Sequence, residues 1–144
     1  MELIRVLPIF LSGLIVIQGC SSSDHSIRYK NSNTPQSLYL RGDMSNWSAS
    51  PDLIAQPQRA KYFTAQTSLK ANQTYHFKFA DKDWTPSLNF GAASDQTVLS
   101  EGKAIPIAAY SCLNELAFTP EKDGVYLFIL DLTGKKYEVK VEKK

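Results

Sequence analysis

Cysteine and histidine are scarce in this chain of 144 residues, which contains only two of each. A tetrahedral zinc site takes about four nitrogen or sulfur ligands, and the set of Cys20, Cys112, His25 and His76 does not have the spacing of one. The phosphate-binding P-loop, the dinucleotide-binding fingerprint and the G-x-S-x-G nucleophile elbow are also absent from the sequence. We therefore expect no metal and no cofactor.

An excess of one charge is also lacking. Sixteen basic residues face fourteen acidic ones, the formal net charge is +2, and the lysines are scattered along the chain. This balance argues against a nucleic-acid partner. The acidic residues leave a glycosidase pair of carboxylates open, but such catalysis needs a deep cleft that one small β domain seldom supplies. The sequence predicts a protein that is not an enzyme.

Residues 1–20 have the organisation of an export signal. Arg5 provides a positive start, and the apolar stretch 6–17 is shorter than the roughly 20 residues that a transmembrane helix needs. The stretch ends in Ile-Gln-Gly-Cys, which resembles the lipobox of bacterial lipoproteins. The resemblance implies a signal peptide over residues 1–19, cleavage after Gly19 and a lipid-bearing Cys20.

The residues after Cys20 bear on where the anchor lies. Ser21 and Ser22 follow it, with no aspartate beside it, which is similar to lipoproteins sorted to the bacterial outer membrane. The domain is then expected to face either the periplasm or the outside. The alternative is an ordinary secretory signal in which Cys20 is incidental and two cysteines remain for a disulfide. With Cys20 acylated, Cys112 is expected to be a small buried apolar residue.

A polar stretch precedes one domain. Residues 20–36 are rich in Ser, Asn and Asp without an apolar period, and predict a flexible tether. The domain is predicted to occupy residues 37–144. Short β-prone runs alternate there with turn residues, and no long window outside the signal has helical periodicity. The predicted strands are 37–42, 61–69, 73–80, 124–131 and 136–142, with weaker candidates at 96–99, 104–108 and 115–119.

The faces of these strands are read from their alternation. The apolar residues are Tyr75, Phe77 and Phe79 in the third strand, and Tyr137, Val139 and Val141 in the last clear one. The stretch 124–131 is apolar on both faces and predicts a central strand. About seven or eight such strands predict an all-β, immunoglobulin-like antiparallel β-sandwich. A closed barrel is the alternative.

Both tryptophans of the chain lie in polar loops that follow a predicted strand. Trp47 follows Arg41-Gly42, and Trp84 comes four residues after Ala80. An indole can cover the C–H face of a sugar ring while neighbouring polar side chains bond its hydroxyls. Lys78 lies on the polar face of its strand and is placed to reach a hydroxyl beside Trp84. Tryptophans also serve as core plugs in sandwiches, so burial of both rings is the alternative.

The pattern Gly42…Asn46-Trp47 followed by Tyr-x-Phe-Lys78-Phe…Trp84 resembles that of starch- and glycogen-binding modules. These include modules of pullulanases and branching enzymes and the glycogen-binding domain of AMP-activated kinase. The resemblance implies that an α-glucan contacts Trp47, Lys78 and Trp84. It also implies contributions from Asn89, in an Asn-Phe-Gly run, and from Asn114.

Two functions of different classes follow from this sequence. The first is a lipid-anchored module that holds starch, glycogen or maltodextrin without cleaving it, for a partner amylase, pullulanase or porin. The second is a structural envelope lipoprotein that binds another protein through a strand edge or a loop. The exposure of the two indole rings, and the distance between them, distinguishes the two.

Overall fold

The computed structural model describes residues 36–111 and 114–144, which contain ten β-strands, three short 3-10 helices and no α-helix. No helix in these ranges is long and apolar enough to span a bilayer. The strands are β1 (Tyr39–Gly42), β2 (Gln56–Arg59), β3 (Tyr62–Leu69), β4 (Tyr75–Ala80), β5 (Asn89–Ala92), β6 (Val98–Leu99), β7 (Ile105–Ala108), β8 (Leu116–Phe118), β9 (Gly124–Asp131) and β10 (Tyr137–Lys143). The 3-10 helices are η1 (Asp43–Ser45), η2 (Pro51–Leu53) and η3 (Pro86–Leu88).

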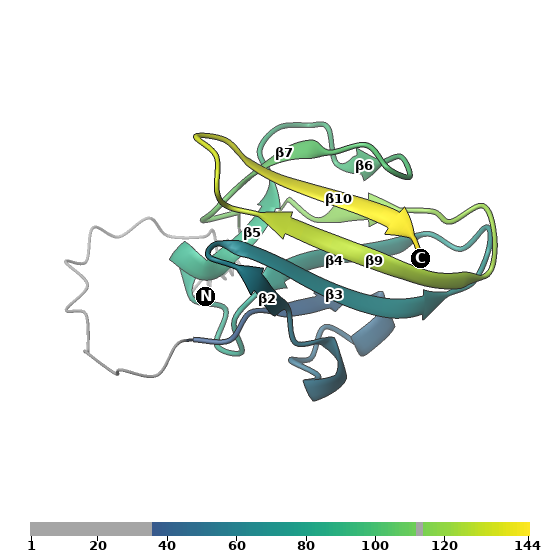
Figure 1. Ribbon diagram of the computed structural model, residues 1–144, viewed down its shortest axis with the longest axis horizontal. Helices are drawn as coiled ribbons and strands as arrows, with labels where there is room; N and C mark the ends of the chain where they lie inside the picture. The colour runs from purple at the N-terminus through teal and green to yellow at the C-terminus, as the bar shows by residue number, and fades with distance from the viewer. Residues whose placement is uncertain (1–35, 112–113) are drawn as a thin grey trace, which may run out of the picture. The chain divides into compact units, whose positions relative to one another are not determined.

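The strands form one open sheet that folds into two layers. Its order is β2-β3-β9-β10-β7-β5-β4-β8-β6, with β1 also paired to β4, and every pair except β6–β8 is antiparallel. Strand β5 joins the layers, because its first half pairs with β4 and its second half with β7. In Figure 1, β3, β9 and β10 lie in front and β4 lies behind them. The predicted all-β sandwich is confirmed.

The core lies between the two layers and follows the alternation of the strands. Tyr75, Phe77 and Phe79 of β4 are buried, as predicted. Across the core the ring of Phe77 meets the ring of Phe128 on β9 edge to face, with centroids 4.9 Å apart. Tyr137 departs from the prediction: it lies at the start of β10, is partly exposed and only touches the core through the edge of Phe90.

All of the predicted strands are present, but β2 and β5 were not predicted. Strand β2 is exposed along its whole length and has no apolar face from which the sequence could predict it. Pro57 within it suits an edge strand, since proline removes a donor from the ladder. Strand β5 holds only four residues, one of them Gly91, which is too short for a clear period.

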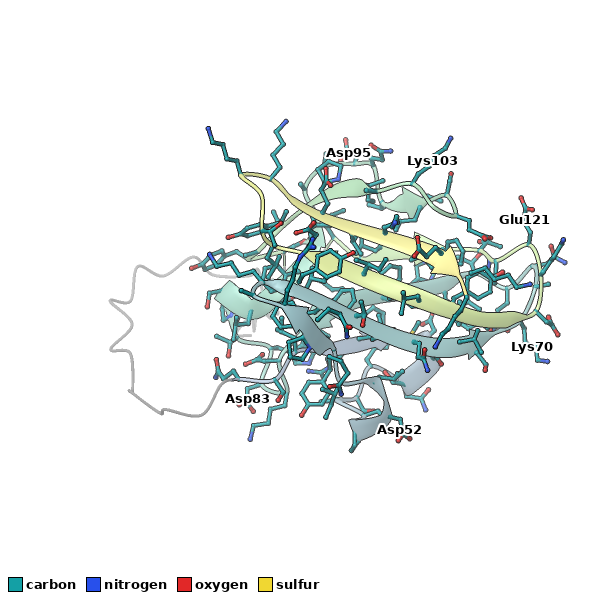
Figure 2. All side chains as sticks on the ribbon, viewed as in Figure 1. Asp52, Lys70, Asp83, Asp95, Lys103 and Glu121 are labelled. Carbon is teal, nitrogen blue, oxygen red and sulfur yellow. The ribbon has the colours of Figure 1, made fainter. Side chains whose placement is uncertain are left out.

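Charged side chains of both signs surround the domain without forming a single-sign surface. Figure 2 shows them pointing outward all round the two layers. The labelled examples, all exposed, are Asp52, Lys70, Asp83, Asp95, Lys103 and Glu121. Charge therefore does not mark a functional surface, which has to be sought in particular loops.

The register of β1, β4 and β5 gathers polar residues on the outer face of one layer. Arg41 lies opposite Lys78, and Ala80 lies opposite Asn89. Since Leu40 and Phe79 between them point into the core, alternation places Arg41, Lys78 and Asn89 on the outside of the same three strands. This outer face is the floor of the site described next.

Candidate functional site

The two tryptophans lie side by side over this outer face. Their ring centroids are 6.3 Å apart, their planes are inclined by 35°, and both rings are half-buried. Because β1 and β4 are antiparallel, the loop 43–50 and the loop 81–88 leave from opposite ends of the pair and turn back toward its middle. The structure thus brings Trp47 and Trp84 together, and neither ring is a core plug.

Three aromatic residues at this site have left-handed backbone conformations. The φ angles are 61° for Trp47, 56° for Trp84 and 61° for Tyr110. Such angles cost a residue with a side chain about 1–2 kcal/mol and are rare for bulky residues. Strain of this kind is concentrated at ligand clamps and active sites. Its recurrence in three aromatic residues makes these loops a candidate functional site.

Tyr110 is a residue that the sequence analysis missed. Its backbone N–H donates to the carbonyl of Pro86, 2.9 Å away, in the loop that carries Trp84. Its side chain is 65% exposed. Tyr110 lies in no predicted strand and in no motif, and only the folded chain places it beside the second tryptophan loop.

Arg41 connects the two tryptophan loops. Its guanidinium carbon lies 3.7 Å from the centre of the Trp84 ring. Its Nε donates to the carbonyl of Trp47 at 2.8 Å, and its Nη1 donates to the carbonyls of Asp81 at 2.8 Å and Lys82 at 3.1 Å. The side chain is only 6% exposed. Burial lowers the pKa of Arg41, and the Asp81 carboxylate opposes that shift.

The buried Asp81 carboxylate fixes the loop that ends in Trp84. Its Oδ1 accepts the backbone N–H of Thr85 at 2.7 Å, and its Oδ2 accepts the Thr85 hydroxyl at 2.6 Å. This pair of bonds closes the segment 81–85 into a compact turn. Both tryptophan loops are therefore held by polar contacts within the domain.

Lys78, the cross-strand partner of Arg41, is buried at this site. It is 3% exposed, and among the described residues its Nζ has no hydrogen-bond partner. Burial lowers the pKa of Lys78 to about 8, and the carboxylate of Glu115 partly opposes that shift. Sequence alternation placed Lys78 on the outer face correctly, but it could not show that loops cover that face.

The two asparagines occupy different positions at the site. Asn89 is 7% exposed, and its Oδ1 is a second buried atom without a described partner. Asn114 is exposed, and its Nδ2 donates to the carbonyl of Ala92 at the far end of β5. Asn89 is thus on the floor with Lys78, and Asn114 is at the margin. Cys20 and Cys112 lie outside the described residues.

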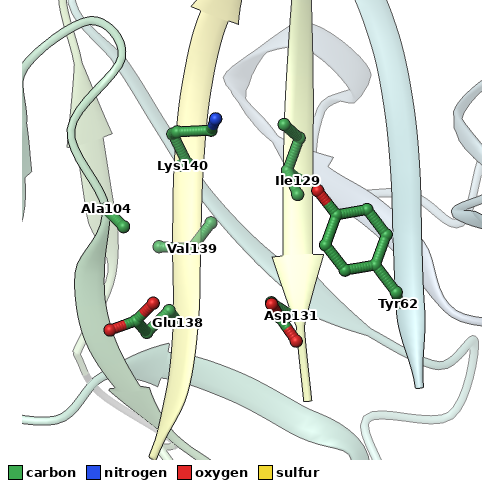
Figure 3. A pocket seen from close by; sticks show the side chains of 7 residues that line it. All are labelled: Tyr62, Ala104, Ile129, Asp131, Glu138, Val139 and Lys140. Atoms are coloured by element: carbon green, nitrogen blue, oxygen red, sulfur yellow. The ribbon is translucent and has the colours of Figure 1, made fainter. Parts of the chain in front are cut away.

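A separate shallow hollow of about 180 Å³ lies on the outer face of the other layer (Figure 3). Asp131 on β9 and Glu138 on β10 are cross-strand partners there, but the Glu138 side chain turns toward Ala104 and away from Asp131 (Figure 3). Asp131 accepts both the backbone N–H and the hydroxyl of Thr133, and these bonds lower its pKa. A general acid needs a raised pKa, so Asp131 is not suited to that role.

Metal chemistry has no support in the described ranges, where no three His, Cys, Asp or Glu side chains gather closely enough to hold an ion. What the arrangement offers is a surface: two tilted indole faces, an exposed tyrosine at the edge and a polar floor. Fold and surface together define a β-sandwich module with an aromatic platform.

Comparison with known proteins supports this class of fold. The solved structure described as "Ligand induced structure of AmyP-SBD", a starch-binding domain, is similar with a TM-score of 0.52 and 22% identity, over 99% of this chain and 96% of that one. At that identity the likeness carries the fold. No protein-family model and no curated protein sequence matches the chain.

Proposed function

We propose that this domain binds an α-glucan such as starch, glycogen or maltodextrin without cleaving it. The observation that carries the proposal is the pair of half-buried indoles, Trp47 and Trp84, inclined by 35° with centroids 6.3 Å apart. Each indole can cover the C–H face of one sugar ring. Successive rings of an α-glucan turn relative to each other, so tilted platforms suit them better than they suit a flat β-linked chain.

The buried polar floor supports the same proposal. Lys78 Nζ is a donor and Asn89 Oδ1 an acceptor, and both lack partners among the described residues. A buried polar atom without a partner costs about 1–3 kcal/mol. A sugar hydroxyl both donates and accepts and has the chemistry to pair with either group, but both atoms are shielded from the surface, so a ligand reaches them only where the covering residues move aside. Asn114 at the margin adds an exposed amide.

The similar solved structure adds support from outside the chain, since its name describes a starch-binding domain. Shallow sites of this kind are expected to have a Kd on the order of 10⁻⁴ to 10⁻³ M, or about −4 to −5.5 kcal/mol. Much of that free energy is expected to come from the two indoles, because burying an aromatic ring removes a large apolar area from water.

Affinity electrophoresis in native gels with and without glycogen tests the proposal. Wild type should be retarded by glycogen, and Trp47→Ala and Trp84→Ala should each lose most of that retardation. Tyr62→Ala is the matched control, since Tyr62 is a half-buried aromatic residue on β3, in the other layer. Retardation by a soluble β-glucan in place of glycogen would contradict the choice of α-glucan. Unretarded wild type, or equal retardation of all variants, would refute the site.

We also propose that the domain is held at the bacterial outer membrane by lipid on Cys20. The short apolar stretch ending in Gly19-Cys20 and the polar residues 20–36 support this. Cys20→Ala should move the protein from the detergent phase to the aqueous phase in detergent-phase partitioning. Retention of the variant in the detergent phase would contradict acylation at this residue. A neighbouring amylase, pullulanase or porin would use the captured glucan.

A further inference from the structure

We infer that Arg41 is a positioning residue that builds the aromatic platform before any ligand arrives. This inference rests on the proposed function, and it concerns a residue to which the sequence motif assigns no role. Arg41 contacts both tryptophan-bearing loops, by stacking on the Trp84 ring and by bonding the carbonyl of Trp47.

The geometry of these contacts makes arginine specific. A guanidinium is planar, stacks on an indole face and donates from several fixed nitrogens, whereas a lysine ammonium is a point charge on a flexible stem. Arg41 uses one face for Trp84 while Nε and Nη1 reach carbonyls of the two loops. Lysine can keep the charge but cannot make the stack and the divergent hydrogen bonds together.

The same stack makes Trp84 a one-sided platform. The guanidinium carbon lies 3.7 Å from the ring centre, which is contact distance, so that face is closed to a ligand. A sugar ring can stack only on the opposite face. Fixing the ring and its tilt relative to Trp47 in the free protein lowers the ordering cost of binding. Arg41 thereby raises affinity without touching the glucan.

The first test measures binding of maltoheptaose by titration calorimetry to wild type and Arg41→Lys. The expected result is a Kd about tenfold higher for the variant, which corresponds to about 1.4 kcal/mol. Arg59→Lys is the matched control, because Arg59 stacks in the same way on Tyr62 with its guanidinium carbon 4.3 Å from the ring centre. It should leave the Kd unchanged. Unchanged affinity in Arg41→Lys would overturn the inference.

A double-mutant cycle separates positioning from general stability. If Arg41 acts through Trp84, Arg41→Lys should raise the Kd about tenfold in wild type but less than about twofold in the Trp84→Ala background. Equal effects in both backgrounds would show that Arg41 supports the fold alone. Glycogen is the probe for this cycle, because its multivalency keeps the weak binding of the variants above the detection limit of affinity gels.

A second measurement, of the indole N–H signals by NMR, uses only the wild-type protein. The chain has two tryptophans, so a ¹⁵N-labelled sample gives one indole N–H signal for each. A platform built in advance predicts one sharp signal per indole in the free protein. Doubled or exchange-broadened signals in free wild type would contradict the inference even if glucan binds. Sharp signals with no maltoheptaose binding would leave Arg41 as the positioning residue and refute the proposed function instead.

Discussion

The side chain of Lys78 passes so close over Gly91 that a Cβ atom on residue 91 would lie 2.9 Å from Lys78 Cε. The same atom would clash with the backbone oxygen of Asn114. Gly91 is also where β5 changes partner from β4 to β7. The absence of a side chain there lets the strand cross between layers and lets the lysine lie flat beneath the site.

Gly91→Ala is therefore expected to destabilise the domain by about 1–3 kcal/mol, because backbone at residue 114 cannot yield as a flexible side chain would. Urea unfolding measures the loss. Gly102→Ala is the contrast: it meets no atom within 4 Å, but its φ of +72° penalises alanine. It should lose about 1 kcal/mol through the backbone and leave glycogen retardation intact. Equal stability of Gly91→Ala and wild type would contradict the close approach.

The pH dependence of stability should carry the signature of Lys78. In the unfolded chain this lysine holds its proton up to about its ordinary pKa of 10.5, but in the folded chain burial lowers the pKa to about 8. Between these values the unfolded chain binds more protons, so the free energy of unfolding rises as pH rises. The free energy of unfolding rises by on the order of 3 kcal/mol at most across this range. Below pH 8 the full cost of burying the charged lysine is present.

Comparison with Lys78→Met separates the contribution of Lys78 to the pH dependence from that of the other lysines and the tyrosines. The variant should be more stable than wild type below pH 8, and its advantage should shrink toward pH 10.5. Lys140→Met should show the opposite sign, because a hydrogen bond to Glu142 raises the pKa of Lys140. Parallel profiles for wild type and Lys78→Met from pH 7 to 10.5 would show that Lys78 is solvated.

The left-handed backbone at Trp84 should reverse the usual order of stability of glycine and alanine variants. Trp84→Gly should be more stable than Trp84→Ala by about 1 kcal/mol, since glycine adopts positive φ freely. Thermal unfolding of the two variants measures the difference, and both should lose most of their retardation by glycogen. At Tyr62 in strand β3 the order should be the usual one, with glycine less stable by about 0.5–1 kcal/mol. A more stable alanine at position 84 would contradict the strained conformation.

The packing of the two layers depends on Phe77. Phe77→Ala should destabilise by about 3–5 kcal/mol, because the ring is fully buried against Phe128 and leaves a cavity. Chemical unfolding monitored by tryptophan fluorescence measures the loss. Val98→Ala, at a side chain that is 65% exposed, should stay within about 0.5 kcal/mol of wild type. A small effect at Phe77 would mean that the layers are held together elsewhere.

The fold was largely predictable because most strands have one buried face. Alternation at Tyr75, Phe77 and Phe79 is enough to identify β4 and its core side. Strand β2 gave no such signal, since an edge strand exposed on all sides has no reason to alternate. Strand β5 divides its four residues between two partners, and no local pattern encodes that division.

The candidate site was predictable in part. Trp47 and Trp84 were singled out because large aromatic residues are unusual in polar loops, and the structure brings them together. Lys78 was expected on the outer face of its strand, within reach of a hydroxyl beside Trp84; alternation gives the face but not the burial of the side chain, which depends on residues far apart in the sequence. Arg41 was given no role from the sequence, because stacking and divergent hydrogen bonds depend on two loops that meet only after folding.

The covered face of Trp84 also governs how a captured polysaccharide would present itself. A chain that touches a platform from one side keeps its opposite flank in water. An enzyme could then work along that flank while the chain stays tethered, so capture and digestion need not compete for the same sugars. A receptor that enclosed the chain on all sides would have to release it first.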